Sequence, residues 1–463
     1  MRVGDYDRRT ILPDQTFPAM TATLRRFLFA PVAIAPLVTF RILLGGLLCV
    51  GALRFMAAGW IETLYVEPTF FFHFYGFAWA EPFGAAGMYA LYSLIALSGL
   101  LVALGAFYRI SAGVLFLSFT YAELVDATNY LNHYYLVCLL LFGLLVVPAH
   151  RAFSVDVRLG RVAPVRTVPA WCIRVFMAQL TLVYFYAGFA KLDHDWLFDA
   201  MPLAVWLPER THLPVLGYFF QFGWVAYAFS WFGALYDLSI GFLLWNKTLR
   251  PWAYAAVIVF HGLTRVLFNI GLFPYIMIFG TLIFFGGAWH ERLLGYFGYR
   301  PAGKSLSTAR PALVRAAITV FFVFQLLFPL RFLAYPGKLL WTEQGYRFAW
   351  RVMLVEKSGQ VTFTVVDEQD GRRTEISNGD YLTRFQEKQL AIQPDFILQF
   401  AHHLAEEYQT KHGFVQPAVY ADAYVSLNGR RARRFVDPSV DLAAVRDGWG
   451  NKDWILDWKS EQQ

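Results

Sequence analysis

Pro36-Leu-Val-Thr-Phe-Arg-Ile-Leu-Leu-Gly-Gly-Leu-Leu-Cys-Val-Gly-Ala-Leu-Arg-Phe-Met-Ala57 is apolar over the length of about 20 residues that a helix needs to cross a bilayer. Further segments of this kind lie at 83–106, 109–127, 134–149, 169–191, 222–245, 251–268, 270–285 and 315–335. Only 16% of the 463 residues are charged, against about 25% in soluble domains. The chain is therefore predicted to be a polytopic α-helical membrane protein with about nine transmembrane helices.

Basic and acidic residues alternate between the loops that separate these segments. The N-terminal segment 1–35 carries five arginines, and the loops 150–168 and 286–314 each carry four basic residues. The loops 58–82 and 192–221 are mainly acidic. Because cytoplasmic loops retain Arg and Lys, nine spans put the N-terminus in the cytoplasm and the C-terminal region outside.

The composition changes after the last apolar segment. Residues 347–376 alternate like strands, 396–409 have the pattern of an amphipathic helix, and Asn428-Gly429 predicts a hairpin between 419–426 and 430–436. The expected organisation is a cytoplasmic segment 1–35, a transmembrane helical domain 36–336 and a small extracytoplasmic α+β domain 337–463.

Several classes of protein are disfavoured by composition. The cysteines Cys49, Cys138 and Cys172 lie within or beside apolar segments, so no disulfide framework is expected. The sequence has no Cys/His spacing typical of a metal site, and we predict no metal. A net charge of +7 can indicate nucleic-acid binding, but in a membrane protein it reflects basic cytoplasmic loops, so no nucleic-acid partner is expected. No cleaved signal peptide is predicted.

Polar residues in or beside the apolar segments are the candidate functional residues, because lipid penalises them unless they are paired or face a cavity. Asn132 and His133 stand at the start of the fourth segment. A capped helix start with interfacial tyrosines is the structural alternative for this stretch. Tyr184, Gly188 and Lys191 share one face of the fifth segment, where the small residues leave room for a flat molecule.

Lys191 has two interpretations. Its long side chain can extend to the outer membrane interface, and its position taken alone favours this role. Alternatively, a lysine held away from water loses its proton more readily and becomes a competent base.

Two more polar sites lie within the later segments. His261 and Arg265 are one helical turn apart and close to a break in the helix. A single buried histidine is usually structural, but a histidine together with an arginine and a helix break is less common. Asp237 lies in the middle of the sixth segment. We predict that Asp237 forms a structural ion pair, with Arg41 or Arg265 as its partner.

Six stretches carry a family resemblance, in order between about residues 36 and 446. They are Asn132-His-Tyr-Tyr-Leu, Tyr184-Phe-Tyr-Ala-Gly-Phe-Ala-Lys-Leu-Asp-His-Asp-Trp196, Asp237-Leu-Ser-Ile-Gly-Phe, Trp341-Thr-Glu-Gln-Gly-Tyr-Arg-Phe-Ala-Trp350, Tyr424-Val-Ser-Leu-Asn and Arg434-Phe-Val-Asp-Pro-Ser-Val-Asp. Together they resemble the vitamin K-dependent γ-glutamyl carboxylases, within the class of horizontally transferred transmembrane domain (HTTM) proteins.

The resemblance implies an enzyme that carboxylates glutamate side chains of a protein or peptide to γ-carboxyglutamate. Reduced vitamin K, the hydroquinone, would be a cosubstrate with dioxygen and carbon dioxide. Lys191 would deprotonate the hydroquinone, with Asn132 and His133 as hydrogen-bonding neighbours. Dioxygen would then give an alkoxide that removes the glutamate γ-proton, the carbanion would attack carbon dioxide, and vitamin K epoxide would be released. The quinone or acceptor pocket would be lined by Tyr184, His261, Tyr346 and Met353.

The chain also departs from the animal enzymes. Ala190 stands where they have a second lysine, and Thr264-Arg265 differs from their small polar pair. The sequence stops at Gln463, short of their luminal extension. These differences are expected to affect which protein acceptor is recognised more than they affect the quinol chemistry. The short chain without a disulfide pattern suggests a bacterial member in the plasma (inner) membrane.

Other functions fit the same residues. A quinol epoxidase would use the same site without carboxylating glutamate. A non-catalytic membrane protein that binds quinone or a partner would keep the scaffold, but it would need no amine at Lys191. A transporter is disfavoured because the sequence has no visible inverted halves.

Overall fold

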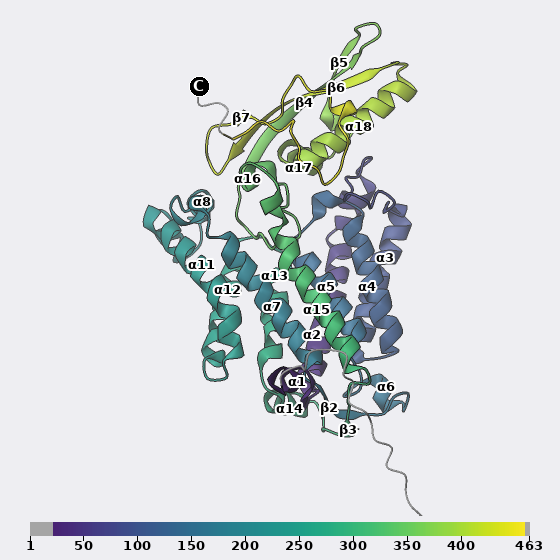
Figure 1. Ribbon diagram of the computed structural model, residues 1–463, viewed down its shortest axis with the longest axis vertical. Helices are drawn as coiled ribbons and strands as arrows, with labels where there is room; N and C mark the ends of the chain where they lie inside the picture. Colours follow the sequence, from purple (N-terminus) through teal and green to yellow (C-terminus); the bar gives the residue numbers. More distant parts are fainter. Residues whose placement is uncertain (1–21, 459–463) are drawn as a thin grey trace, which may run out of the picture.

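A bundle of helices and a smaller sheet-containing domain that covers one end of it make up the molecule (Figure 1). The computed structural model describes residues 22–458. The helical bundle comprises residues 22–334, and the sheet domain comprises residues 357–458. Most of the segment 1–35, predicted to be cytoplasmic, lies outside the described residues.

Within residues 22–458, five helices are long and apolar enough to cross a membrane, namely α2 (Ala35–Ala57), α3 (Gly84–Leu104), α7 (Trp171–Ala190), α11 (Gly223–Trp245) and α15 (Pro311–Leu327) with its extension η5 (Phe328–Ala334). A sixth span arises if the bent pair is counted as one, the pair being α13 (Phe273–Thr281) with η4 (Leu282–Phe284), and α14 (Gly287–Gly295). The chain bends by 114° between the two parts of this pair.

The other three predicted spans form helices that are shorter or more polar than these. They are α4 (Tyr108–Leu124), α5 (Asn132–Val146) and α12 (Arg250–Leu267). Over residues 22–458, helix length and composition therefore support five or six spans. The higher number predicted from the sequence counted every apolar segment, whereas helices of 15 or 17 residues, such as α5 and α4, are short for a bilayer.

Glycine contacts set the spacing of two helix pairs. A methyl group on Gly45 of α2 would lie 2.7 Å from the carbonyl oxygen of Gly99 in α3, and one on Gly188 of α7 would lie 2.5 Å from the backbone nitrogen of Leu238 in α11. Such close backbone approach is typical of helices packed within membranes. Gly188 itself leaves no room for a flat molecule, because α11 fills the space beside it.

The end of the bundle away from the sheet domain holds three short strands, β1 (Pro31–Ala33), β2 (Val165–Pro169) and β3 (Lys304–Ser305) (Figure 1). Arg41 is fully buried near this end and donates to the carbonyl oxygens of Ala149 at 3.0 Å and Phe153 at 2.7 Å. The pairing of Arg41 with Asp237 is therefore a wrong prediction, because the guanidinium binds backbone carbonyls that follow α5.

The sheet domain is an antiparallel sheet with two helices against it. Its strand order is β5 (Arg373–Ile376), β4 (Lys357–Asp367), β6 (Pro417–Leu427) and β7 (Arg433–Arg434). The helices are α17 (Arg384–Ile392) and α18 (Pro394–Lys411). The hairpin prediction is confirmed: β6 and β7 pair, and Asn428 and Gly429 between them have φ of 51° and 70°. No strand forms at 347–356, where the sequence predicted one.

Hydrogen bonds join the sheet domain to the loops at the near end of the bundle. Gln399 of α18 exchanges two hydrogen bonds of 2.9 Å with the backbone of His73. Gln386 of α17 donates to the carbonyl oxygen of Phe70 at 2.7 Å. These hydrogen bonds hold the sheet domain over the bundle on the side of α3 and α4 (Figure 1).

Candidate functional site

A cavity of about 320 Å³ lies between α7, α11, α12 and α13, at the end of the bundle that faces the sheet domain. We call it the Lys191 cavity. Its walls are mainly apolar and include the rings of Phe229, Phe260 and Phe273. Ligand sites typically combine such walls with a few polar groups and have volumes of about 300–1,000 Å³. Five of the predicted site residues line this cavity, namely Tyr184, Lys191, Asp237, His261 and Met353.

Lys191 follows the last residue of α7, and its side chain is only 7% exposed. Its Nζ donates to Oδ2 of Asp237 at 2.8 Å and to the carbonyl oxygen of Ala187 at 3.3 Å. The same nitrogen lies 5.1 Å from the centre of the Trp196 ring. The amine therefore points into the bundle beside the cavity, and not toward the membrane interface.

Asp237 has a different partner from the two that were expected. Its carboxylate pairs with Lys191, and both side chains are 7% exposed. Arg265 is exposed on α12, and Arg41 lies toward the other end of the bundle. The contact at Gly188 explains the pairing, because it brings the backbone of α11 against the last turn of α7.

Tyr184 and His261 form the second polar pair of the cavity. The tyrosine hydroxyl lies 2.8 Å from Nε2 of His261, and both side chains are buried. Nδ1 of His261 is buried and has no hydrogen-bond partner among residues 22–458. Because buried polar atoms are normally paired, an unpartnered ring nitrogen beside a cavity fits a ligand with a hydroxyl group.

Asn132 and His133 do not line the Lys191 cavity. His133 is buried, and its ring packs against Phe273 at 5.7 Å, while His261 lies 5.4 Å from the same phenyl ring. Nδ2 of Asn132 donates to the carbonyl oxygen of Arg351 at 2.9 Å. Asn132 therefore contacts the backbone next to Val352 and Met353, which line the cavity. The ring of Phe273 lies between His133 and His261 and contacts both.

Residues 346–353, which we call the wall segment, separate the Lys191 cavity from the space on the other side. Val352 and Met353 line the Lys191 cavity. The backbone φ angles of Phe348, Trp350 and Met353 are 58°, 57° and 55°, a left-handed conformation that bulky residues rarely adopt. Such strain costs about 1–3 kcal/mol per residue and is concentrated at functional sites.

Tyr346, the first residue of the wall segment, faces the space on the other side and does not line the Lys191 cavity. It contributes to two cavities of about 640 Å³ and 620 Å³, which we call the outer cavities. Both are also lined by Glu123, Tyr130, Glu343 and Arg347. Tyr346 therefore does not share a cavity with the other residues predicted to line the quinone or acceptor pocket.

Sequence reasoning missed the aromatic wall of the cavity. Phe232, Phe260 and Phe273 carried no distinguishing signal, because phenylalanine is as typical of lipid-facing positions as of cavity walls. Trp196 belonged to a quoted motif without an assigned role, yet it is buried and lies under the Lys191 amine. The phenylalanines could not have been distinguished without knowing how the helices pack.

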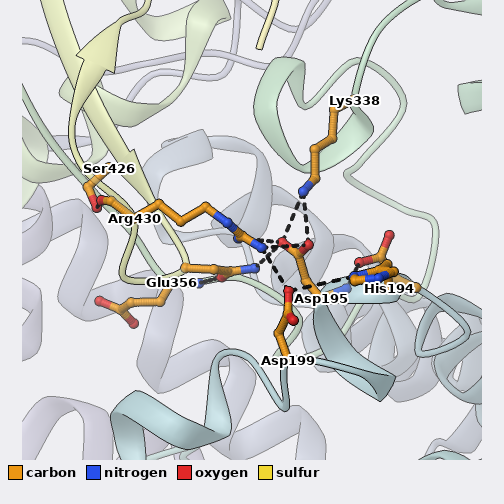
Figure 2. A network of polar contacts seen from close by, with 9 residues as sticks. His194, Asp195, Asp199, Lys338, Glu356, Ser426 and Arg430 are labelled. Atoms are coloured by element: carbon orange, nitrogen blue, oxygen red, sulfur yellow. Dashed lines mark hydrogen bonds and ion pairs between the residues drawn. The ribbon is translucent and has the colours of Figure 1, made fainter. Parts of the chain in front are cut away.

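The part of the chain that the structure describes holds one group with metal-ligand atoms within 4.8 Å of each other, formed by His194, Asp195 and Asp199. Figure 2 shows that its two carboxylates already meet two cations, since Lys338 pairs with Asp195 and Arg430 pairs with both aspartates. The two negative charges are thereby neutralised, so this group does not fit a metal ion.

We expect Asn132→Asp to loosen the wall segment. A carboxylate has nearly the shape of the amide but donates no hydrogen bond, so the carbonyl oxygen of Arg351 loses its partner, at a cost of about 1–3 kcal/mol. Trypsin should then cleave after Arg347 and Arg351 faster than in the native protein. Asn129→Asp is the matched control, because its amide nitrogen has no partner among residues 22–458. Equal cleavage rates in the two variants would contradict this role of Asn132.

Two family models match the chain. The HTTM domain model matches residues 29–289, and the model of the vitamin K-dependent gamma-carboxylase lumenal domain matches residues 310–461. No solved structure matches the chain. The first match covers more than half of the chain, and the two follow each other in the order of the bundle and the sheet domain. The resemblance stated from six sequence stretches is confirmed, and the chain belongs to the vitamin K-dependent gamma-carboxylase family, with an HTTM domain followed by a lumenal-type domain.

Proposed function

We propose that the protein carboxylates glutamate side chains of a protein or peptide to γ-carboxyglutamate, coupled to epoxidation of reduced vitamin K by dioxygen. The observation that carries the proposal is the Lys191–Asp237 pair, held at 2.8 Å beside an apolar cavity. An amine with a carboxylate partner in such a place can accept a proton from a weakly acidic hydroxyl group.

The Lys191–Asp237 ion pair can become neutral by transfer of one proton within the pair. Separated charges cost free energy where few polar groups surround them, and moving a proton from Nζ to Oδ2 leaves both groups neutral. Lys191 then has a free electron pair and can act as the base toward the hydroquinone. Asp237 keeps the proton that the lysine gave up. The proton that Nζ then takes from the hydroquinone therefore arrives at a pair with no net charge.

The other cavity residues bind and orient the hydroquinone. The rings of Phe260 and Phe273 offer apolar faces, and Nδ1 of His261 is available to a hydroxyl group. Tyr184 holds the His261 ring through Nε2. When bound, reduced vitamin K supplies, with dioxygen, the strong base that removes the glutamate γ-proton.

The chain must keep water out, because water would protonate so strong a base. Val352 and Met353 of the wall segment cover the Lys191 cavity on the side of the sheet domain. Asn132 holds this segment through the carbonyl oxygen of Arg351. We assign to Asn132 a positioning role, and to His133 the support of Phe273.

The acceptor glutamate is proposed to approach through the outer cavity of about 620 Å³, which Tyr346 lines. Arg331 also lines it, and its guanidinium donates to the carbonyl oxygens of Phe328 and Arg347, with no carboxylate partner among residues 22–458. A glutamate carboxylate can pair with Arg331 there. Because the wall segment separates this cavity from Lys191, the strained residues of that segment are expected to shift when the acceptor binds.

The membrane topology is proposed with the sequence-based assignment. All nine apolar segments would cross the plasma membrane of a bacterium, with the N-terminus in the cytoplasm and the sheet domain outside. The shorter helices α4, α5 and α12 pack within the bundle, where the membrane can thin around them at a modest cost.

The purified protein in lipid, supplied with reduced vitamin K, dioxygen, labelled carbon dioxide and a glutamate-rich peptide, is expected to fix label in the peptide and to form vitamin K epoxide. Boiled protein and oxidised vitamin K are the controls. Epoxide without label would identify a quinol epoxidase instead, and neither product would contradict the proposed function.

A further inference from the structure

The short helix α8 (His194–Leu197) lies between the Lys191 cavity and the sheet domain and contacts both. Trp196 lines the cavity and donates through Nε1 to the carbonyl oxygen of Ser230 in α11 at 2.8 Å. The neighbouring residue, Asp195, extends instead toward the sheet domain (Figure 2). Both residues follow Lys191 within five positions, so a shift of α8 must move the wall of the cavity beside the amine.

Asp195 is 4% exposed and receives donors from two distant parts of the chain. Lys338 lies 3.0 Å from both carboxylate oxygens, and Arg430 lies 2.8 Å and 3.0 Å from them (Figure 2). Nδ2 of Asn428 also donates to Oδ2 at 2.9 Å. Burial raises the pKa of Asp195, but the hydrogen bonds from Arg430, Lys338 and Asn428 outweigh it and lower the pKa below the usual value. Arg430 also pairs with Asp199 at 3.0 Å, so two cations meet two carboxylates.

The turn that carries Asn428 also contacts the rest of the cavity wall. Asn428 exchanges hydrogen bonds of 2.8 Å and 2.9 Å with the backbone of Glu356, which follows the wall segment by three residues. The carboxylate of Glu356 accepts from the indole nitrogen of Trp206 in α9 (Leu203–Trp206). Leu203 of the same helix lines the cavity. The turn therefore contacts α8 directly and, through Glu356, is linked to α9 and to the chain that follows the wall segment. Residues of α8, α9 and the wall segment line the Lys191 cavity.

We propose that Asp195 is a positioning residue that couples docking of the sheet domain to closure of the Lys191 cavity. Its carboxylate holds the turn at 428–430 and Lys338 onto α8, and α8 carries Trp196 against the cavity on its other side. This role rests on the proposed function, which needs a cavity without water. An ion pair that merely adds stability would leave the access of water to the cavity unchanged.

Access of water to the cavity can be measured without any enzyme activity. Ala187 lines the cavity and is buried, so Ala187→Cys puts a thiol there with little change of volume. The rate at which a charged, water-soluble methanethiosulfonate reagent modifies this thiol, above that of the native cysteines, reports how often the cavity opens to water. In Asp195→Asn the rate is expected to rise by about tenfold, equivalent to about 1.4 kcal/mol in the opening equilibrium.

Three further variants make the result specific. Arg430→Gln and Lys338→Gln remove the cations and leave α8 unaltered, and each is expected to raise the labelling rate as Asp195→Asn does. If Asp195→Asn fails to fold, the labelling rates of these two variants test the proposal instead. Asp422→Asn is the matched control, because it removes the exposed pair with Arg434, and it is expected to leave the rate unchanged. Unchanged labelling in all three network variants, even with lower thermal stability, would overturn the proposal.

The enzyme assay then separates this inference from the proposed function. Admission of water should protonate the strong base before it reaches glutamate, so Asp195→Asn is expected to form more epoxide per carboxylated glutamate than the native protein does. An unchanged ratio alongside faster labelling would overturn the link between closure and coupling. If the native protein forms neither product, the proposed function fails, and the labelling rates still decide whether Asp195 closes the cavity.

Discussion

Lys191→Met is expected to lower the rates of epoxide formation and of glutamate carboxylation together, by about 10²–10⁴-fold, the usual contribution of a general base. The reason is that methionine fills the same buried position beside the Lys191 cavity but cannot accept a proton. Both products are measured in the assay with labelled carbon dioxide and a glutamate-rich peptide. A loss of carboxylation alone would place Lys191 at the acceptor step and not at the hydroquinone.

Lys191→Arg separates the base from the ion pair. The guanidinium keeps a positive charge that can pair with Asp237, but it does not release its proton in proteins. We therefore expect Lys191→Arg to be as inactive as Lys191→Met while it retains more of the native stability. Lys247→Met, which removes an exposed lysine beyond the far end of α11, is the control for loss of a lysine. An active Lys191→Arg variant would show that only the charge at this position matters.

Asp237→Asn is expected to destabilise the helical bundle strongly. Removing one partner of a buried ion pair leaves the other charge uncompensated and typically costs about 3–5 kcal/mol. Equilibrium unfolding in mixed micelles with increasing dodecyl sulfate should therefore show a lower midpoint for this variant. Its activity should fall as well, because Lys191 loses the group that takes its proton.

A double variant tests whether the cost arises from the pair itself. Lys191→Met with Asp237→Leu removes both charges and is expected to recover much of the lost stability, although not the activity. Asp370→Asn serves as the comparison, since it breaks the exposed pair with Arg372 and should change stability by less than about 1 kcal/mol. If Asp237→Asn unfolds at the native midpoint, the buried pair does not stabilise the bundle.

Local features of the sequence predicted much of the fold. The apolar segments at 36–57, 169–191 and 222–245 became α2, α7 and α11, because hydropathy over a helix length depends on neighbouring residues alone. Asn428-Gly429 gave a hairpin because both positions require a positive φ, which these residues adopt readily. The number of spans was harder to predict, since an apolar segment can bend, as between η4 and α14, or end early, as in α5.

The candidate site was predictable where a motif carried it and not where packing created it. Tyr184, Lys191 and His261 were chosen as polar residues in apolar surroundings, and the structure brings them to one cavity. Tyr346 was grouped with them, but it lines the outer cavities instead. The left-handed residues that turn this segment, such as Phe348, have no sequence signature, because only the surrounding contacts hold them in that conformation.

The amino-acid sequence by itself determined which segments are apolar helices, which residues bear the amine, the imidazoles and the carboxylates, and to which family the chain is related. Only the tertiary structure decided that Asp237 meets Lys191, 46 residues away, and that Asp195 meets Arg430, 235 residues away. Hydropathy and turn preference are properties of a short stretch of chain. The partner of a charged group depends on how closely two backbones approach. At Gly188 the backbones of α7 and α11 come into contact, and only the packing of these two helices decides that distance.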